Sequence, residues 1–241
     1  MVEGESFLVD TDAEMREQLA ARLDRYIIAD DVNIEDVSDA FALFHVTGPA
    51  APAIGAAIVV ARAERFGCSG HDLWIAREQH GAALQELSAA LPTCDADCAE
   101  VFRIERAVPR WGHELTDEII PTEANLEESA IDYGKGCYIG QEVISRIKMS
   151  GQTNKRLCGL VPSTNTPLLA GMRLTAKGSE GRDVGWVTSA TWSARFKSHI
   201  ALGFVKRGFN TPGAELDALA LENAYGSAAV RVQVVALPFA L

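Results

Sequence analysis

The chain has 241 residues, of which 48% are hydrophobic and 23% charged, and its net charge is −11. This is an ordinary composition for a globular protein, and no apolar run reaches the roughly 18 residues that a membrane-spanning helix needs. The first residues lack the basic and apolar regions of a secretory signal or a transit peptide. Five cysteines without a tight spacing framework argue against a disulfide scaffold, so a cytoplasmic location is expected.

Strand-like and helix-like patterns alternate over the first part of the chain. Strands are predicted at residues 7–9, 32–37, 41–46 and 73–76, and helices at residues 15–27, 82–91 and 95–106. Gly48-Pro49 ends a strand and is expected to open a further helix, because proline is tolerated in a first helical turn. This alternation predicts an α+β domain.

The pattern changes near Lys155. Residues 107–134 are punctuated by proline and glycine, which predicts loops, and residues 138–148 predict a helix. Five strand-like runs follow, at residues 157–161, 173–176, 184–187, 200–205 and 230–235. Short strands at this spacing predict a small β-barrel or sandwich, and we expect one domain at residues 1–154 and a second at residues 155–241.

Charge is distributed unevenly along the chain. Residues 135–207 hold twelve Lys or Arg and three Asp or Glu, a balance of +9, whereas the remaining residues sum to −20. The asymmetry indicates a basic surface on an acidic body, or charges that scatter once the chain folds. A basic surface would attract anions such as an acidic partner or RNA.

Cys137 stands in an unusual local sequence, with Lys135 and two glycines directly before it. Glycines make a pliable loop, and both a nearby lysine and the start of the predicted helix favour thiolate over thiol. The segment is therefore a candidate for a reactive or ligating cysteine. The alternative is a small buried hydrophobic residue that happens to be cysteine.

Arg103, Glu105 and Trp111 form a second candidate group. Arg103 and Glu105 are two positions apart, so on a helix they point to different sides, and one could face a cavity while the other braces a loop. A guanidinium binds a carboxylate in a bidentate manner, and Trp111 could stack on a flat ring or fill core. Ordinary surface charges are the alternative.

No metal site is predicted. The five histidines are dispersed, and no pair has the spacing of a metal-binding helix. Gly-rich dinucleotide and phosphate-binding motifs are missing too. A metal hydrolase or a nucleotide-dependent enzyme is therefore unsupported.

Several segments, taken in order, resemble one known family. They are residues 103–105, 109–115, 121–126, 135–142 with Arg146 beyond, 185–189 and 201–207. Residues 135–142, Lys-Gly-Cys-Tyr-Ile-Gly-Gln-Glu, are specific to the family. Each of the other segments is a weak match alone, but their order along the chain makes the resemblance strong. The chain is similar to the folate-binding family that includes the glycine-cleavage T-protein (aminomethyltransferase), on its YgfZ-like branch.

The resemblance implies a T-protein-like folate-binding α+β domain followed by a C-terminal β-barrel, with tetrahydrofolate as the cofactor. It implies catalytic roles for Cys137 and Lys135. The residues implied to bind the cofactor are Arg103, Glu105, Trp111, Tyr138, Gln141 and Arg146. The implied function is support for the assembly or repair of iron–sulfur cluster enzymes, with an effect on tRNA modification through them. Expected partners are folate and iron–sulfur client or assembly proteins, with RNA less favoured and neither DNA nor a membrane expected.

The chain also departs from the family at its start. Family members begin several dozen residues earlier, and the carboxylate that the T-protein uses near folate lies upstream of residues 7–9. We therefore expect that the N-terminal part is missing or that part of the folate pocket is lost, and truncation would make the mitochondrial matrix an alternative location. Transferase activity is left open. The alternative functions are a folate-dependent aminomethyl or one-carbon transferase and a non-catalytic RNA or protein adaptor.

Overall fold

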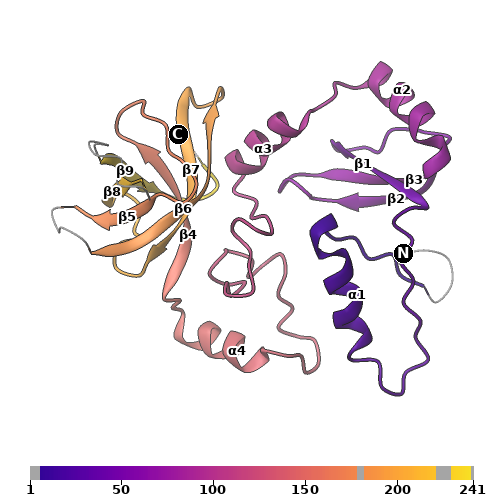
Figure 1. Ribbon diagram of the computed structural model, residues 1–241, viewed down its shortest axis with the longest axis horizontal. Coiled ribbons are helices and arrows are strands. Elements are labelled where there is room, and N and C mark those ends of the chain that lie inside the picture. The colour runs from indigo at the N-terminus through magenta and orange to yellow at the C-terminus, as the bar shows by residue number, and fades with distance from the viewer. Residues whose placement is uncertain (1–5, 178–181, 221–228, 240–241) are drawn as a thin grey trace. The chain divides into compact units, whose positions relative to one another are not determined.

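The computed structural model describes residues 6–177, 182–220 and 229–239. The chain divides into two compact units, Met1–Cys94 and Asp95–Leu241, drawn from indigo to purple and from magenta to yellow in Figure 1. Within the described ranges, no helix is both long and apolar enough to cross a membrane.

Unit 1 is built on a small antiparallel sheet with strand order β1-β3-β2. Its elements are a short 3-10 helix at Ala13–Met15, α1 (Arg16–Asp24), β1 (Phe41–Thr47), β2 (Ala57–Ala63), β3 (Gly70–Ala76), a second 3-10 helix at Arg77–Gln79 and α2 (His80–Ala90). Leu73 and Ile75 of the central strand are fully buried and pack with Ala83 and Leu87 of α2. Residues two apart on a strand share a face, so this pair gives the sheet its apolar side.

A charged cluster ties the N-terminal segment to this sheet. Asp72 of β3 accepts hydrogen bonds from Arg65 Nε and Nη2, each at 2.8 Å, and lies 2.8 Å from His45 Nδ1 on β1. Arg65 also pairs with Asp10. Burial alone would raise the pKa of Asp72, but its hydrogen bonds with Arg65 and His45 outweigh that effect and lower the pKa. The carboxylate of Asp72 therefore stays charged and hydrogen-bonded to Arg65 and His45.

Unit 2 contains a closed, antiparallel six-stranded barrel with strand order β4-β7-β6-β5-β8-β9. Its elements are α3 (Ala96–Glu105), α4 (Gln141–Ser150), β4 (Lys155–Pro162), β5 (Arg173–Ala176), β6 (Asp183–Ser193), β7 (Ser198–Lys206), β8 (Glu215–Leu219) and β9 (Val230–Val235). Strand alternation divides the apolar residues into two clusters. Along β7, Ala201 and Val205 belong to the cluster inside the barrel, whereas Leu202 and Phe204 belong to a second cluster.

The second cluster joins the barrel wall to the segment before it. Phe204 of β7 and Leu157 of β4 pack with Ile104 of α3 and with Ala124 from the loops that follow α3. All four side chains are buried. Residues 95–154 therefore share a hydrophobic core with the barrel and belong to the same compact unit.

The predicted α+β class with a C-terminal β-barrel is confirmed. The helices expected at residues 82–91 and 95–106 and the five predicted barrel strands are all present, and β8 is an additional strand that sequence patterns missed. The domain boundary at residue 155 stays a prediction, although the barrel begins there.

Three local predictions in unit 1 are wrong. Residues 7–9 and 32–37 are irregular rather than extended in a strand, and no helix follows Gly48-Pro49. Phe7 is 79% exposed, so it contributes little to a core. Residues 57–63, for which no element was predicted, pair with β3, so this strand depends on tertiary pairing more than on local pattern.

Gly185 on β6 is required by close packing of the barrel wall. A Cβ atom there would press against the carbonyl oxygen of Phe204 on the neighbouring strand, and backbone cannot move aside as a flexible side chain can. We expect Gly185→Ala to destabilise unit 2 by at least about 2 kcal/mol. Urea unfolding followed by circular dichroism measures this. Gly136→Ala is the control, because nothing lies within 4 Å of its added Cβ, and an equal loss in both variants would contradict the packing argument.

Candidate functional site

Arg103, in the last turn of α3, is buried and uses all five of its N–H donors within the protein. Nε and Nη2 donate to the two carboxylate oxygens of Glu100, at 2.9 and 2.5 Å. Nη1 donates to the carbonyl oxygen of Val108 at 2.8 Å and to Glu114 Oε2 at 2.9 Å. Nη2 also donates to Ser189 Oγ on β6 at 2.8 Å. Because a guanidinium has five donors, none remains for a ligand carboxylate in this arrangement.

Glu114 is the counterpart of Arg103 and is completely buried. Its Oε2 accepts hydrogen bonds from Arg103 and from the backbone N–H of Arg110, the latter at 3.1 Å. Its Oε1 accepts hydrogen bonds from the hydroxyls of Thr188 at 2.7 Å and Ser189 at 2.6 Å. A buried carboxylate is tolerated only when it is paired and hydrogen-bonded, and four donors meet that condition here. The network links α3, the loop after it and β6.

The electrostatics favour the charged forms of Arg103 and Glu100. Burial disfavours the charged form of Arg103, but its hydrogen bond to Glu100 and the charge of Glu114 outweigh that effect and raise the pKa of the guanidinium. The hydrogen bond from Arg103 is the main reason that the pKa of Glu100 lies below its ordinary value of 4.5. The arrangement is therefore a closed ion network rather than an open anion receptor.

Glu105 and Trp111 lie between Arg103 and Glu114 in the sequence. Glu105 is buried, and its Oε1 accepts a 2.5 Å hydrogen bond from Ser193 Oγ at the end of β6. Trp111 is half-buried and forms an isolated backbone bridge with Leu115. Glu105 thus braces a loop, one of the two roles that sequence spacing suggested for this pair.

The loop after residue 120 is fastened to the first barrel strand. Glu123 is buried, and its Oε2 lies 3.0 Å from Lys155 Nζ on β4. The backbone N–H of Leu157 donates to the carbonyl oxygen of Glu123 at 2.8 Å. Asn125, which has a φ of +61°, donates through Nδ2 to the carbonyl oxygen of Leu157 at 2.9 Å. These contacts place a polar loop against the barrel wall.

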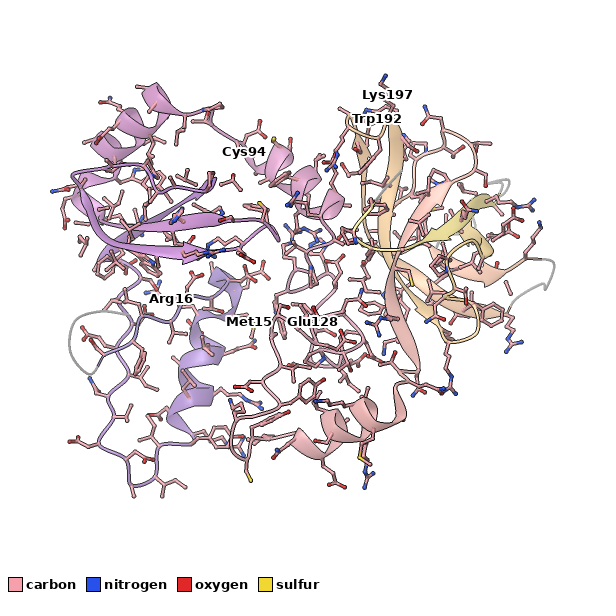
Figure 2. All side chains as sticks on the ribbon, turned by 180° about the vertical axis from the view of Figure 1, so that it is seen from behind. Met15, Arg16, Cys94, Glu128, Trp192 and Lys197 are labelled. Carbon is pink, nitrogen blue, oxygen red and sulfur yellow. The ribbon has the colours of Figure 1, made fainter. Side chains whose placement is uncertain are left out.

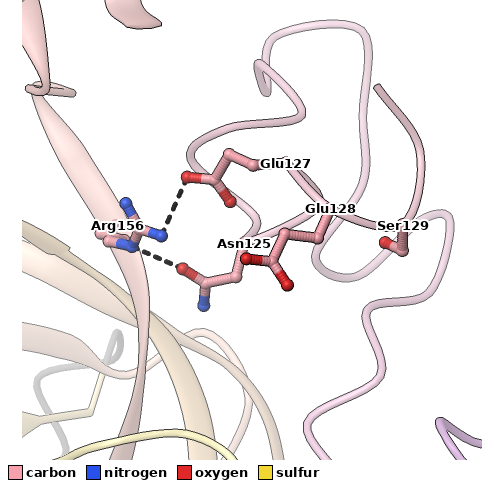
Figure 3. Close-up of a pocket in the computed structure, with 5 residues that line it drawn as sticks. All are labelled: Asn125, Glu127, Glu128, Ser129 and Arg156. Atoms are coloured by element: carbon pink, nitrogen blue, oxygen red, sulfur yellow. Dashed lines mark hydrogen bonds and ion pairs between the residues drawn. The ribbon is translucent and has the colours of Figure 1, made fainter. Parts of the chain in front are cut away.

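An open, polar hollow of about 430 Å³ lies beside this loop (Figure 3). Its lining residues are Asn125, Glu127, Glu128, Ser129 and Arg156. Arg156 Nε donates to Asn125 Oδ1 at 2.6 Å, and its Nη2 lies 2.9 Å from Glu127 Oε1. Two carboxylates against one guanidinium do not favour an anionic ligand. None of the six predicted folate-binding residues lines the hollow.

Cys137 lies in an exposed segment that leads into α4. The helix begins at Gln141, three residues later than predicted, because Gly140 occupies the N-cap with a φ of +89°. Cys137 is therefore three residues before the cap, whereas the electrostatic effect of a helix terminus is confined to about one turn. Lys135 Nζ lies 5.5 Å from the ring centroid of the half-buried Tyr138. This contact joins a residue before Cys137 to the residue directly after it.

The remaining predicted residues lie on α4. Gln141 is half-buried at the first position of the helix, and the exposed Arg146 pairs with Glu142 one turn earlier. Across the part of the chain that the structure describes, no hydrogen bond or ion pair joins these α4 residues to Arg103, Glu105 or Trp111. The predicted residues therefore form two separate groups.

Folate binding by Arg103 stays a prediction, but in this arrangement the guanidinium is occupied by partners within the protein. The sequence suggested a bidentate contact between the guanidinium and a ligand carboxylate, whereas the five donors of Arg103 are engaged by Glu100, Val108, Glu114 and Ser189. Among the residues described, no group of three or more His, Cys, Asp or Glu side chains could hold a metal ion.

Sequence reasoning missed the partners of Arg103. Glu114 and Ser189 bind it directly, and Thr188 binds Glu114; all three fall inside segments that carried the family resemblance, at residues 109–115 and 185–189. The motif positions were therefore a usable signal. Their pairing across more than 70 residues of sequence was not visible before the fold was known.

Comparisons with known proteins agree with this architecture. Residues 155–240 match the family model described as the glycine cleavage T-protein C-terminal barrel domain. An aminomethyltransferase of Aquifex aeolicus is 32% identical, over 61% of this chain and 39% of that protein. An aminomethyltransferase of Saccharopolyspora erythraea is 27% identical, over 98% of this chain and 70% of that protein. The mitochondrial iron–sulfur cluster assembly factor IBA57 homolog of Dictyostelium discoideum is 26% identical, over 66% of this chain and 42% of that protein.

A solved structure shows the same fold. The glycine cleavage system aminomethyltransferase T of Bartonella henselae superimposes with a TM-score of 0.65 at 20% identity, over 75% of this chain and 49% of that chain. The chain thus spans about half the length of several relatives, from 39% to 70% of the proteins compared. The barrel thus resembles the C-terminal domain of the glycine cleavage T-protein, and the chain as a whole is similar in sequence to aminomethyltransferases.

The Arg103 network should stabilise unit 2 strongly. Arg103→Met removes five hydrogen bonds and leaves the buried Glu114 without its cation, so we expect a loss of about 3–5 kcal/mol. Denaturant unfolding measures this loss. Arg146→Met is the control, because its exposed pair with Glu142 should contribute no more than about 0.5 kcal/mol. Similar losses in the two variants would show that Arg103 is not a structural residue.

Glu100 should make the stability of unit 2 depend on acidity. Its pKa is lowered in the folded protein from the ordinary value of 4.5, so its stabilising contribution is fully present above that value and is lost as the pH falls through the folded pKa. Thermal melts between pH 7 and pH 3 should show this loss. Glu100→Gln should flatten the acid limb of the profile, and a profile identical to that of the wild type would contradict the assignment.

Proposed function

We propose that this chain is a folate-binding accessory protein that supports the assembly or repair of iron–sulfur cluster enzymes, on the YgfZ-like branch of its superfamily. The observation that carries the proposal is Cys137, exposed in the Lys-Gly-Cys-Tyr-Ile-Gly-Gln-Glu segment at residues 135–142. The similarity to the Dictyostelium iron–sulfur cluster assembly factor homologue supports it. The partners are then iron–sulfur client or assembly proteins, the location is the cytoplasm, and any effect on tRNA modification is indirect.

Cys137 has the accessibility that such a role requires. Three other cysteines are exposed or half-buried, and Cys158 is buried in the barrel. Burial raises the pKa of the Cys158 thiol to about 11, which keeps it protonated and inert at neutral pH, since the thiolate is the nucleophile and metal ligand. Cys137 differs from Cys94 and Cys98, which are also exposed, in its glycine-flanked loop and its neighbour Lys135. We assign it the role of the functional thiol.

Folate enters the proposal through the family resemblance and the similarity to aminomethyltransferases. Trp111 and Tyr138 are half-buried aromatic residues that suit a flat ring, one in each group of predicted residues. Arg103 is excluded from the proposed contacts, because its donors are engaged. Tetrahydrofolate supplies a one-carbon acceptor when bound, and this chain would contribute its binding surface.

A second candidate is a folate-dependent aminomethyltransferase of the glycine-cleavage type. The names of the relatives from Aquifex and Saccharopolyspora favour it. The two candidates differ in their dependence on Cys137. Aminomethyl transfer to tetrahydrofolate that persists in Cys137→Ala would favour the transferase.

Cys137 should matter more than the other cysteines in cells. We expect Cys137→Ala to lose most of the ability to restore an iron–sulfur enzyme, such as a radical-type tRNA-modifying enzyme, in cells that lack the native gene. Cys94→Ala and Cys98→Ala are matched controls, because both thiols are exposed, and they should restore activity fully. Full restoration by Cys137→Ala, at equal protein levels, would remove the functional-thiol role.

A further inference from the structure

The turn between β6 and β7 carries an exposed aromatic and cationic surface that the proposed function does not use. Trp192 is 43% exposed, and Arg195 and Lys197 are exposed in the turn. Figure 2 shows Trp192 and Lys197 close together at one end of the barrel. Residues 191–199 contain no carboxylate, although the whole chain is strongly acidic.

Buried residues of the barrel wall and α3 hold the turn in place. Ser193 Oγ donates to the buried Glu105 and accepts a hydrogen bond from the backbone N–H of Phe196 at 3.1 Å. Phe196 is half-buried in the second apolar cluster, with its ring centroid 6.2 Å from that of Phe239. Anchoring Phe196 inward leaves its neighbours Arg195 and Lys197 exposed. A surface held in this way loses little conformational entropy when a ligand binds.

The cations of the turn are available to an anion. Arg195 lies over its neighbour Phe196, with 5.0 Å between the guanidinium carbon and the ring centroid. Neither Arg195 nor Lys197 pairs with a carboxylate among the residues that the structure describes. This distinguishes them from Lys177 and Arg173 of the same barrel, which pair with Glu215 and Asp183.

Trp192 supplies a flat apolar face beside these cations. His199 is its direct partner on β7, and their rings meet edge to face at 5.0 Å. The histidine therefore supports the indole without stacking flat upon it. An exposed aromatic ring next to cations is the combination by which proteins hold a base and its phosphate, through stacking and charge.

We propose that Trp192, Arg195 and Lys197 form a binding surface for a nucleobase that carries phosphate, either a free nucleotide or a unit of single-stranded RNA. The indole stacks on the base, and the two cations contact the phosphate attached to the same nucleotide or to its neighbour. The surface lies outside the segment of Cys137, so this binding is independent of the proposed folate and thiol functions.

Fluorescence anisotropy tests the proposal. It measures the binding of a fluorescein-labelled single-stranded 12-mer RNA to the full chain at 25 mM and 150 mM salt. Trp192→Ala should weaken binding by about tenfold, as expected for the loss of one stacked base, whereas Trp192→Phe should keep most of the affinity. The double variant Arg195→Gln, Lys197→Gln should make the slope of log K against the logarithm of the salt concentration shallower by about 1.4. This change is expected for the loss of two phosphate contacts with a single strand. Arg182→Gln is the control, because Arg182 also lies over a phenylalanine, Phe209, at 5.1 Å.

Competition identifies the source of the ligand. Displacement of the labelled RNA by a mononucleotide at micromolar concentration indicates a free nucleotide, whereas displacement only by unlabelled oligomer indicates RNA. The proposal is overturned if the wild type does not bind at 25 mM salt, if Arg182→Gln loses as much affinity as the double variant, or if tetrahydrofolate polyglutamate displaces the RNA, which would assign the surface to folate. Thermal melts of each variant confirm folding. None of these outcomes depends on restoration of an iron–sulfur enzyme by Cys137, so the two proposals fail separately.

Discussion

The buried ion pair between Arg103 and Glu114 is the interaction on which unit 2 depends. A carboxylate with no exposed surface is costly to bury, and Glu114 is stable there because a guanidinium, a backbone N–H and two hydroxyls meet it. The same guanidinium reaches Glu100 and Ser189. One charged pair thus joins a helix, a loop and a barrel strand that are far apart in the sequence.

This constraint separates the packed part of the unit from the exposed segment to which we assign the functional thiol. The network and the apolar cluster around Phe204 hold α3 on the barrel wall, and Glu105 at the end of α3 then braces the β6–β7 turn. The segment with Cys137 lies outside the network and exposes its thiol. Such a division suits a protein that presents a reactive group from a fixed scaffold.

Sequence patterns predicted the strands whose own residues alternate between a buried and an exposed face. The alternating apolar runs of the barrel were readable, because each strand buries one face in the barrel. By contrast, β8 (Glu215–Leu219) has only five residues, two of them acidic, and its strand character depends on pairing with β5 and β9. Residues 32–37 alternate equally well but find no partner strand. Arg103 was recognised as important, yet its role depends on Ser189, 86 positions away, which no local pattern connects to it.

A double-mutant cycle on Arg103 and Glu114 tests the central role of this pair most directly. Arg103→Met, Glu114→Leu and the combined variant would be unfolded in urea under the same conditions. If each charge is stabilised chiefly by the other, the combined variant should be more stable than Arg103→Met alone, with a coupling energy of at least about 2 kcal/mol. Additive losses, with no coupling between the two substitutions, would contradict this account and leave the anchoring of α3 to the apolar cluster alone.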